Sequence, residues 1–257
     1  MNRIEVHCLN PQAIADAEKM LVLSARLTQA GHKMRGPKDF FDLAEKPYSD
    51  QALKRLIALP HPTLQKFGLI NMVVIGASRR FLAQITRHQN EVKFMSASLQ
   101  YSDYGDSADF VVPLNLLGPD ETLARSNYIE QCERSMREYK SLTALGISHD
   151  EAGYCAPQAL RNVLIISATP YQWKHMIRQR TCKRNTLETR LVMLLAWQKL
   201  TELSPTLFED CGPACTRGTC QEGKMSCLNP LPKTESADDL LVPFKDAFER
   251  AKEGPRE

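Results

Sequence analysis

Leu69-Ile70-Asn71-Met72-Val73-Val74-Ile75 is rich in β-branched residues and predicts a strand. Three residues later, Ser78 can cap a helix whose inward face carries Phe81 and Ile85. The polar stretch 84–91 then joins this helix to a second strand. A strand, a helix and a polar connection therefore follow one another directly.

The elements around this stretch are helices and strands without regular βαβ alternation. Residues 11–30 predict a helix with Asn10 as its N-cap and Gly31 as its end. The other expected elements are helices after Ser49, over 121–145, after Thr169 and from Leu187 to before Pro205, and a strand over 163–166. This order favours an α+β fold over a doubly wound parallel sheet. No GxGxxG motif is present, which excludes the usual Rossmann dinucleotide site.

Composition indicates an ordinary globular protein with one main domain. The chain has 257 residues, of which 43% are hydrophobic and 25% charged, and a net charge of +3. No apolar run is long enough for a membrane span and no signal core follows Met1, so we expect a cytoplasmic protein without a membrane partner. The small net charge does not predict nucleic-acid binding, so an anionic ligand must meet locally placed basic residues.

The first cluster of chemically capable residues lies at 84–104. At helical spacing, Gln84, Arg87 and His88 share one face at the edge of the core. Strand alternation places four polar residues on one side of the following segment: Ser96, Ser98, Gln100 and Ser102. Arginine with hydroxyl and amide groups suits a phosphate and a base edge. The alternative is a solvated helix end followed by a polar edge strand.

A second basic cluster lies in and after the helix capped by Thr169. Its members are Lys174, His175, Arg178, Arg180, Lys183 and Arg184. They are either a functional cluster or cations on the outer face of an amphipathic helix, favoured near its C-terminus by the dipole. Arg180 can reach inward if Trp173, Met176 and Ile177 form the core face of the helix.

The eight cysteines fall into two groups. Four are scattered among apolar residues and are expected to be small buried hydrophobes: Cys8, Cys132, Cys155 and Cys182. The others form a C-x3-C-x4-C-x6-C pattern: Cys211, Cys215, Cys220 and Cys227. Four thiolates suit zinc or an iron–sulfur cluster, and the alternative is free or disulfide-capable thiols in a surface loop. From Pro230 onward we expect a loose tail with one short helix.

The run Gln84-x-x-Arg87-His88, followed by Ser98-x-Gln100-Tyr101-Ser102, resembles the signature of the flavin-dependent thymidylate synthases. That signature is RHR, then a serine-rich stretch, then S-x-R-Y. Flanking segments agree in order: His61-Pro62-Thr63, Ala156-Pro157 and the stretch from Thr169 through Arg180 to Glu188. The likeness covers roughly residues 61–210.

This resemblance implies a homotetrameric α+β enzyme with a central antiparallel sheet flanked by helices. It also implies a catalytic domain over 1–210 and a cysteine-rich tail over 211–257. Such an enzyme binds FAD between subunits without a Rossmann motif. It converts dUMP to dTMP, with methylenetetrahydrofolate supplying the carbon and NADPH the electrons.

The resemblance also assigns roles position by position. The cofactor-binding residues would be His61, Thr63, Arg87, His88, Gln89, Thr169 and His175. The dUMP-binding residues would be Gln84, Arg87, Ser98, Gln100 and Arg180. Arg180 would be catalytic, because a fixed cation at the uracil edge stabilises negative charge as C5 becomes nucleophilic. No cysteine nucleophile is required.

The sequence departs from the family pattern at several positions. Gln89, Gln100 and Gly153 stand where arginines are expected, Ser96 where a carboxylate is frequent, and Lys66 where an acid is usual. The loss of arginines weakens the binding of a phosphate dianion, because charge-assisted contacts are roughly twice as strong as neutral ones.

These departures leave four alternatives open. Other basic residues could bind dUMP, such as Arg161, Arg178 or Arg184. The enzyme could instead act on a related pyrimidine nucleotide or deliver a hydroxymethyl group. The fold could also serve as a non-catalytic nucleotide-binding or zinc-binding protein.

Overall fold

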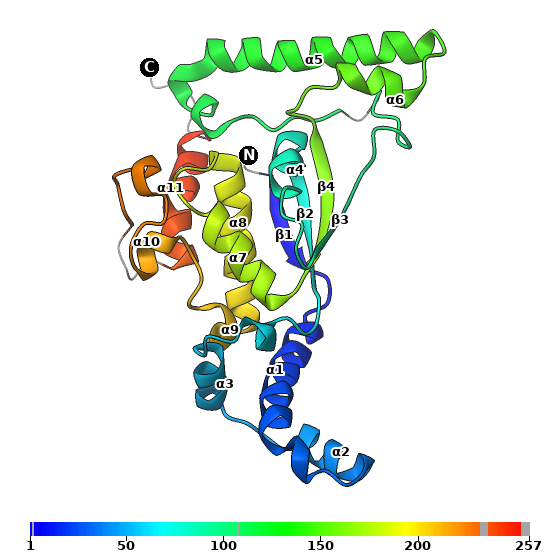
Figure 1. Ribbon diagram of the computed structural model, residues 1–257. Helices are drawn as coiled ribbons and strands as arrows, with labels where there is room; N and C mark the ends of the chain where they lie inside the picture. Colours follow the sequence, from blue (N-terminus) through cyan, green and yellow to red (C-terminus); the bar gives the residue numbers. More distant parts are fainter. Residues whose placement is uncertain (2, 107, 232–235, 253–257) are drawn as a thin grey trace.

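The computed structural model describes residues 1, 3–106, 108–231 and 236–252 (Figure 1). Its centre is an antiparallel sheet with the strand order β1 (Glu5–Cys8), β2 (Ile70–Ser78), β4 (Arg161–Ala168) and β3 (Val92–Ser96). The predicted α+β fold with a central antiparallel sheet is confirmed.

Helices lie at both ends of the sheet and over one face (Figure 1). At one end are α1 (Gln12–Ala30), α2 (Pro37–Glu45) and α3 (Asp50–Ile57), and across the other are α5 (Thr122–Ala144) and α6 (His149–Ala152). Beside the sheet are α4 (Arg79–Ile85), α7 (Pro170–Arg180) and α8 (Leu187–Leu203), followed by α9 (Pro205–Phe208), α10 (Ala214–Arg217) and α11 (Ala237–Arg250). Within the described ranges, no helix has the length and apolar character that crossing a membrane requires.

Three helix starts follow the predicted caps. The side-chain oxygens of Ser49, Ser78 and Thr169 accept hydrogen bonds from the backbone amides three residues later, at 3.3, 3.1 and 3.2 Å. Each bond satisfies one of the amides that a helix start leaves without a partner. The chain therefore enters α3, α4 and α7 where the sequence predicts.

The predicted cap at Asn10 is wrong. Pro11 occupies the N-cap position of α1, and no side chain caps this helix. The side-chain nitrogen of Asn10 instead donates to the Leu69 carbonyl at 3.0 Å, and its side-chain oxygen accepts from the backbone amide of Asn71 at 2.8 Å. Asn10 thereby ties the start of α1 to the start of β2.

The main hydrophobic core fills the space between the sheet and the helices α4, α7 and α8. Trp173, Met176 and Ile177 are fully buried, so the expected inward face of α7 is confirmed. The indole of Trp173 donates to the Ile70 carbonyl at 3.0 Å, which fixes α7 against β2. Of the four scattered cysteines, Cys132 is buried, and Cys8, Cys155 and Cys182 are partly exposed.

The chain after Pro230 is more ordered than expected. The predicted helix exists as α11, which packs against α8. Leu240, Leu241 and Phe244 on this helix belong to the main core. The expectation of a loose tail is therefore wrong for residues 236–250, while residues 232–235 and 253–257 lie outside the described residues. The domain boundary near residue 210 stays a prediction.

The strand predicted to continue through residue 102 ends at Ser96. Residues 97–105 form a loop instead, so the expected alternation of Ser98, Gln100 and Ser102 does not exist. Leu99 holds this loop against a second, smaller core that contains Met136 and Tyr139 of α5. The sequence has polar residues at alternate positions here, but the packing of Leu99 under α5 determines the backbone conformation.

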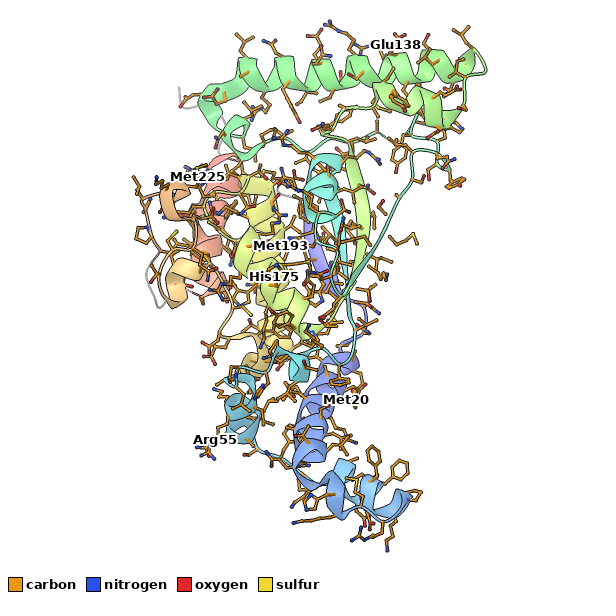
Figure 2. The ribbon with its side chains drawn as sticks, viewed as in Figure 1. Met20, Arg55, Glu138, His175, Met193 and Met225 are labelled. Carbon is orange, nitrogen blue, oxygen red and sulfur yellow. The ribbon has the colours of Figure 1, made fainter. Side chains whose placement is uncertain are left out.

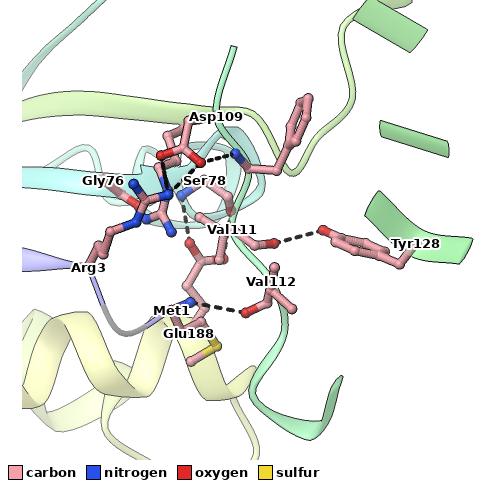
Figure 3. Close-up of polar contacts among 11 residues, drawn as sticks. Met1, Arg3, Gly76, Ser78, Asp109, Val111, Val112, Tyr128 and Glu188 are labelled. Carbon is pink, nitrogen blue, oxygen red and sulfur yellow. Dashed lines mark hydrogen bonds and ion pairs between the residues drawn. The ribbon is translucent and has the colours of Figure 1, made fainter. Parts of the chain in front are cut away.

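Polar contacts hold the sheet, α8 and α5 together at the end of β2 (Figure 3). The backbone amide and the hydroxyl of Ser78 each donate to the Glu188 carboxylate at 2.6 Å. The Tyr128 hydroxyl on α5 donates to the Val111 carbonyl at 2.8 Å. These bonds fix the corner from which α4 and the polar stretch 84–91 start.

Candidate functional site

A cavity of about 460 Å³ lies between the end of α4 and α7. It is lined by Arg87, His88, Gln89, Asn90, Gln172, His175, Gln179 and Arg180. Five of these residues are among the predicted site residues, and they come from two segments some ninety positions apart in the sequence. Figure 2 shows His175 on α7, beside the sheet. The fold thus joins the two polar clusters at one place.

Arg180 is held by all three of its guanidinium nitrogens. Its Nε donates to Nε2 of His88 at 2.9 Å, and its Nη2 donates to the backbone carbonyl of Gln84 at 3.0 Å. Its Nη1 donates to Oδ1 of Asn185 at 3.3 Å. Arg180 is the last residue of α7, so the helix and these three bonds set the position of a cation at the cavity wall.

His88 is neutral at physiological pH. Burial lowers its pKa to about 4, with further lowering by Arg180, His175 and Arg87. Because a guanidinium nitrogen can only donate, Nε2 of His88 must carry a lone pair, and the ring proton therefore sits on Nδ1. The His175 ring meets the His88 ring edge to face at 5.7 Å between centroids. Burial also lowers the pKa of His175.

The positive charge of the cavity therefore comes from arginine. Burial and the neighbouring Arg87 lower the pKa of Arg180, which remains charged. Among the described residues, no carboxylate lines the cavity. Two guanidinium groups with the amides of Gln89, Asn90 and Gln179 favour an anionic ligand that accepts several hydrogen bonds.

The side chain of Gln84 does not line this cavity. Its Oε1 accepts from the hydroxyl of Thr189 at 2.6 Å and from that of Thr186 at 3.3 Å, both at the start of α8. Its backbone carbonyl supports Arg180 instead. In this chain Gln84 is therefore placed to position Arg180.

Thr169 is buried at the start of α7 and does not line the cavity. Its hydroxyl accepts from the Gln172 amide and donates to the Glu91 carboxylate at 3.0 Å. Glu91 also pairs with Lys66 at 2.6 Å. Lys66, which stands where the family has an acid, thus makes an ion pair next to the site.

His61 and Thr63 lie outside the cavity. Thr63 lies in a short 3₁₀ helix, Pro62–Gln65, which starts after His61, and both side chains are exposed. This turn is connected to α7, because Lys174 donates to the side chain of Gln65 at 2.6 Å. It is therefore a neighbour of the site, not part of the cavity wall.

Ser98 and Gln100 are also outside the cavity. They lie in the loop after β3, where the hydroxyl of Ser98 accepts from the Gln100 amide at 3.0 Å. Gly153 lies beside this loop, because a Cβ at that position would be 3.3 Å from Cβ of Leu99. A single chain therefore groups these three positions of the family pattern near one loop, at the opposite end of β3 from Thr169.

Arg79 is a candidate that the sequence reasoning missed. It lines a neighbouring cavity of about 520 Å³ together with Ser96 and Gln158. Within the described part of the chain, its buried Nη1 has no hydrogen-bond partner. Nothing in the sequence separates Arg79 from the adjacent, exposed Arg80, because only the fold decides which of the two turns inward.

Comparisons with known proteins agree with this arrangement. The family described as "Thymidylate synthase complementing protein" matches residues 12–206. A flavin-dependent thymidylate synthase of Geobacter sulfurreducens is 25% identical over 221 residues, covering 84% of this chain and 91% of the relative. One of Clostridium tetani is 26% identical over 204 residues, covering 72% and 79%.

Two solved structures share the fold. The UMP/dUMP methylase PolB of Streptomyces cacaoi, bound with 5-Br dUMP, has a TM-score of 0.64 at 18% identity and covers 80% of this chain and 93% of its own. Thymidylate Synthase X of Helicobacter pylori, with FAD and dUMP, has a TM-score of 0.58 at 17% identity and covers 81% and 98%. Since the family match spans most of the sequence, the chain belongs to the flavin-dependent thymidylate synthase family.

Proposed function

We propose that this chain is an FAD-dependent thymidylate synthase that methylates dUMP reductively to dTMP. Methylenetetrahydrofolate supplies the carbon and NADPH the electrons. The observation that carries the proposal is the pair of Arg180 and neutral His88 in a cationic cavity lined, among the described residues, without a carboxylate.

The donor set of the cavity fits a flavin nucleotide. Arg87 provides a cation for its anionic part, and Gln89, Asn90 and His175 provide hydrogen-bonding groups beside it. Bound FAD would supply the transfer of reducing equivalents from NADPH to the pyrimidine.

Arg180 has the catalytic role in this proposal. Its guanidinium lies against the uracil edge and stabilises negative charge that develops on the ring as C5 becomes nucleophilic. His88 keeps the guanidinium in place through Nε2, and the Gln84 carbonyl does so from the other side. Because these bonds are made within the protein itself, little reorganisation is needed during the reaction.

A complete site requires more than one copy of the chain. Ser98 and Gln100 lie away from the Arg180 cavity, so we infer that another copy brings its loop 97–105 to this cavity. The uncovered sheet face supports assembly, because it exposes a row of apolar side chains: Ile75, Met95, Val163 and Ile165. A homotetramer with FAD between subunits is the arrangement that we propose.

A second candidate function follows from the substituted positions. Gln89, Gln100 and Gly153 lower the positive charge available to a phosphate dianion. In this second function, UMP or another pyrimidine nucleotide is the substrate, or the product carries a hydroxymethyl group. Arg79, whose Nη1 has no hydrogen-bond partner among the described residues, could compensate near Ser96.

Two measurements test these assignments. FAD titration of the purified protein should give a yellow, stoichiometric complex, and failure to take up FAD would reject both enzyme functions and leave a non-catalytic protein. Tritium release from [5-³H]dUMP with methylenetetrahydrofolate and NADPH should then be observed. Inert dUMP alongside reactive UMP or dCMP would replace the first function by the second, and product mass separates methyl from hydroxymethyl.

A further inference from the structure

Four cysteines line one cavity next to the proposed active site, and they are not the four that the sequence spacing suggests. The cavity has a volume of about 580 Å³ and lies between the loop after α7 and the segment 213–230. Its thiols are Cys182, Cys215, Cys220 and Cys227. Cys211 is buried in the main core instead, at 4% exposure.

Cys182 joins the tail cysteines because of where α7 ends. The helix stops at Arg180, and the following turn brings Cys182 under the segment that carries α10 and a 3₁₀ turn, Gly223–Met225. Arg180 and Gln179 line this cavity as well as the proposed active site, so the two cavities adjoin. Met225, labelled in Figure 2, lies on the exposed outside of the segment.

The charge around the cavity fits a negatively charged centre. Four cationic side chains line its wall against one carboxylate, Glu222: Arg178, Arg180, Lys183 and Arg184. Arg190 lies close enough to Cys182 and Cys227 to interact with them electrostatically. Its buried Nε has no hydrogen-bond partner within the described ranges. A metal-bound sulfur would give this donor an acceptor, and such bonds are typical around iron–sulfur clusters.

The arrangement of the thiols favours a cluster over a single ion. Zinc requires all its sulfur ligands about 2.3 Å from one point. Among the described residues, no three His, Cys, Asp or Glu side chains lie close enough together to hold a single metal ion. The ligands of an iron–sulfur cluster are divided among several irons, so thiols that surround a roomy cavity suit it.

We propose that Cys182, Cys215, Cys220 and Cys227 ligate an iron–sulfur cluster beside the active-site cavity. One distant ligand and three closely spaced ones is a division that such proteins use. The cluster fixes the segment 213–230 against the turn that follows Arg180. This proposal does not depend on the thymidylate synthase reaction.

The test is metal analysis of the full chain, purified without oxygen and reconstituted with ferrous iron and sulfide. We expect about two or about four irons, with equal sulfide, per chain, and an electron paramagnetic resonance signal in one redox state of the cluster. Zinc without iron, or no metal after reconstitution, would overturn the proposal.

Single variants test the ligand set. Cys182→Ser and Cys220→Ser should each lose most of the iron, whereas Cys155→Ser, whose thiol packs in the smaller core, should retain it. Circular dichroism and FAD binding check that each variant is folded. Iron retained in folded Cys182→Ser but lost in folded Cys211→Ala would show that the ligand set is wrong.

Discussion

Arg180 donates from Nε to Nε2 of His88 at 2.9 Å, across 92 positions of sequence. This bond requires a neutral histidine, and burial beside cations keeps it neutral. Arg180, the proposed catalytic cation, and His88 of the predicted motif therefore depend on each other. In this pair Arg180 is the charged donor, and His88 is the neutral acceptor that holds it.

Arg180→Ala should reduce kcat by at least about 100-fold, because the fixed cation that stabilises the developing negative charge is removed. FAD should stay bound, since Arg87 and the amides of the cavity remain. Single-turnover tritium release and FAD titration measure the two effects. Arg137→Ala, on the exposed face of α5, is the charge-matched control and should behave like the wild type. Unchanged turnover in Arg180→Ala would remove this residue from catalysis.

The protonation of His88 should make stability depend on pH. In the unfolded chain its pKa is about 6.5, and in the folded chain about 4. Between these values the unfolded state binds more protons, so the free energy of unfolding falls as the pH is lowered from 6.5 to 4. The contribution at neutral pH is on the order of 3 kcal/mol.

Urea unfolding at pH 7 and pH 4.5 measures this dependence. His88→Gln retains a hydrogen-bond acceptor for Arg180 without a titrating ring, so its pH dependence should be shallower than that of the wild type. Replacing the exposed His32 by Gln gives the control. The same slope in His88→Gln and the wild type would show that His88 does not carry the effect.

The sequence predicts those features whose partners are local. Ser49, Ser78 and Thr169 cap helices through amides three residues away, so the chain itself contains the signal. Asn10 has equally good cap chemistry, yet its partners at Leu69 and Asn71 lie about sixty positions away. Tertiary contacts override the local preference there.

The site shows the same division between local and distant information. The family pattern brings Arg87, His88 and Arg180 to attention, and the fold places them in one cavity. The family pattern does not reveal that Cys182 lies with the tail cysteines, because the turn after α7 determines that arrangement. One chain alone does not bring loop 97–105 to the cavity, so that part of the site stays a prediction.

Gln100→Arg should strengthen dUMP binding if loop 97–105 reaches the nucleotide. A charge-assisted hydrogen bond contributes about 1.5–3 kcal/mol, so KM for dUMP should fall by roughly 10-fold or more. Gln131→Arg adds the same charge on the exposed face of α5 and should leave KM unchanged. Equal KM values in Gln100→Arg and the wild type would place position 100 away from the phosphate. Steady-state kinetics at several dUMP concentrations decides.

Ile165→Lys should dissociate the homotetramer that we propose. Ile165 pairs with Met95 on the uncovered face of the sheet, and the two side chains are 39% and 71% exposed. A lysine there would place a charge in an apolar interface, which costs several kcal/mol when it is unpaired. Light scattering after gel filtration should show smaller species, with loss of FAD. Leu145→Lys, in the exposed turn after α5, is the control, and an intact tetramer in Ile165→Lys would exclude this face.

Gly212→Ala should destabilise the fold strongly where the tail begins. Gly212 has a φ of +106°, and a Cβ there would lie 2.7 Å from Cη2 of Trp197. Trp197 cannot move aside, since it is 1% exposed and its indole donates to the Phe208 carbonyl at 2.9 Å. Backbone strain and overpacking each cost about 1–3 kcal/mol.

Gly146→Ala isolates the backbone part of this cost. Gly146 also has a positive φ, +87°, but a Cβ there has no neighbour within 4 Å. Its replacement should therefore lower the free energy of unfolding by only about 1–3 kcal/mol. Urea unfolding of both variants should show the larger loss in Gly212→Ala. Equal losses would mean that Trp197 and the backbone at residue 212 can separate, so that the start of the tail is not fixed to the core.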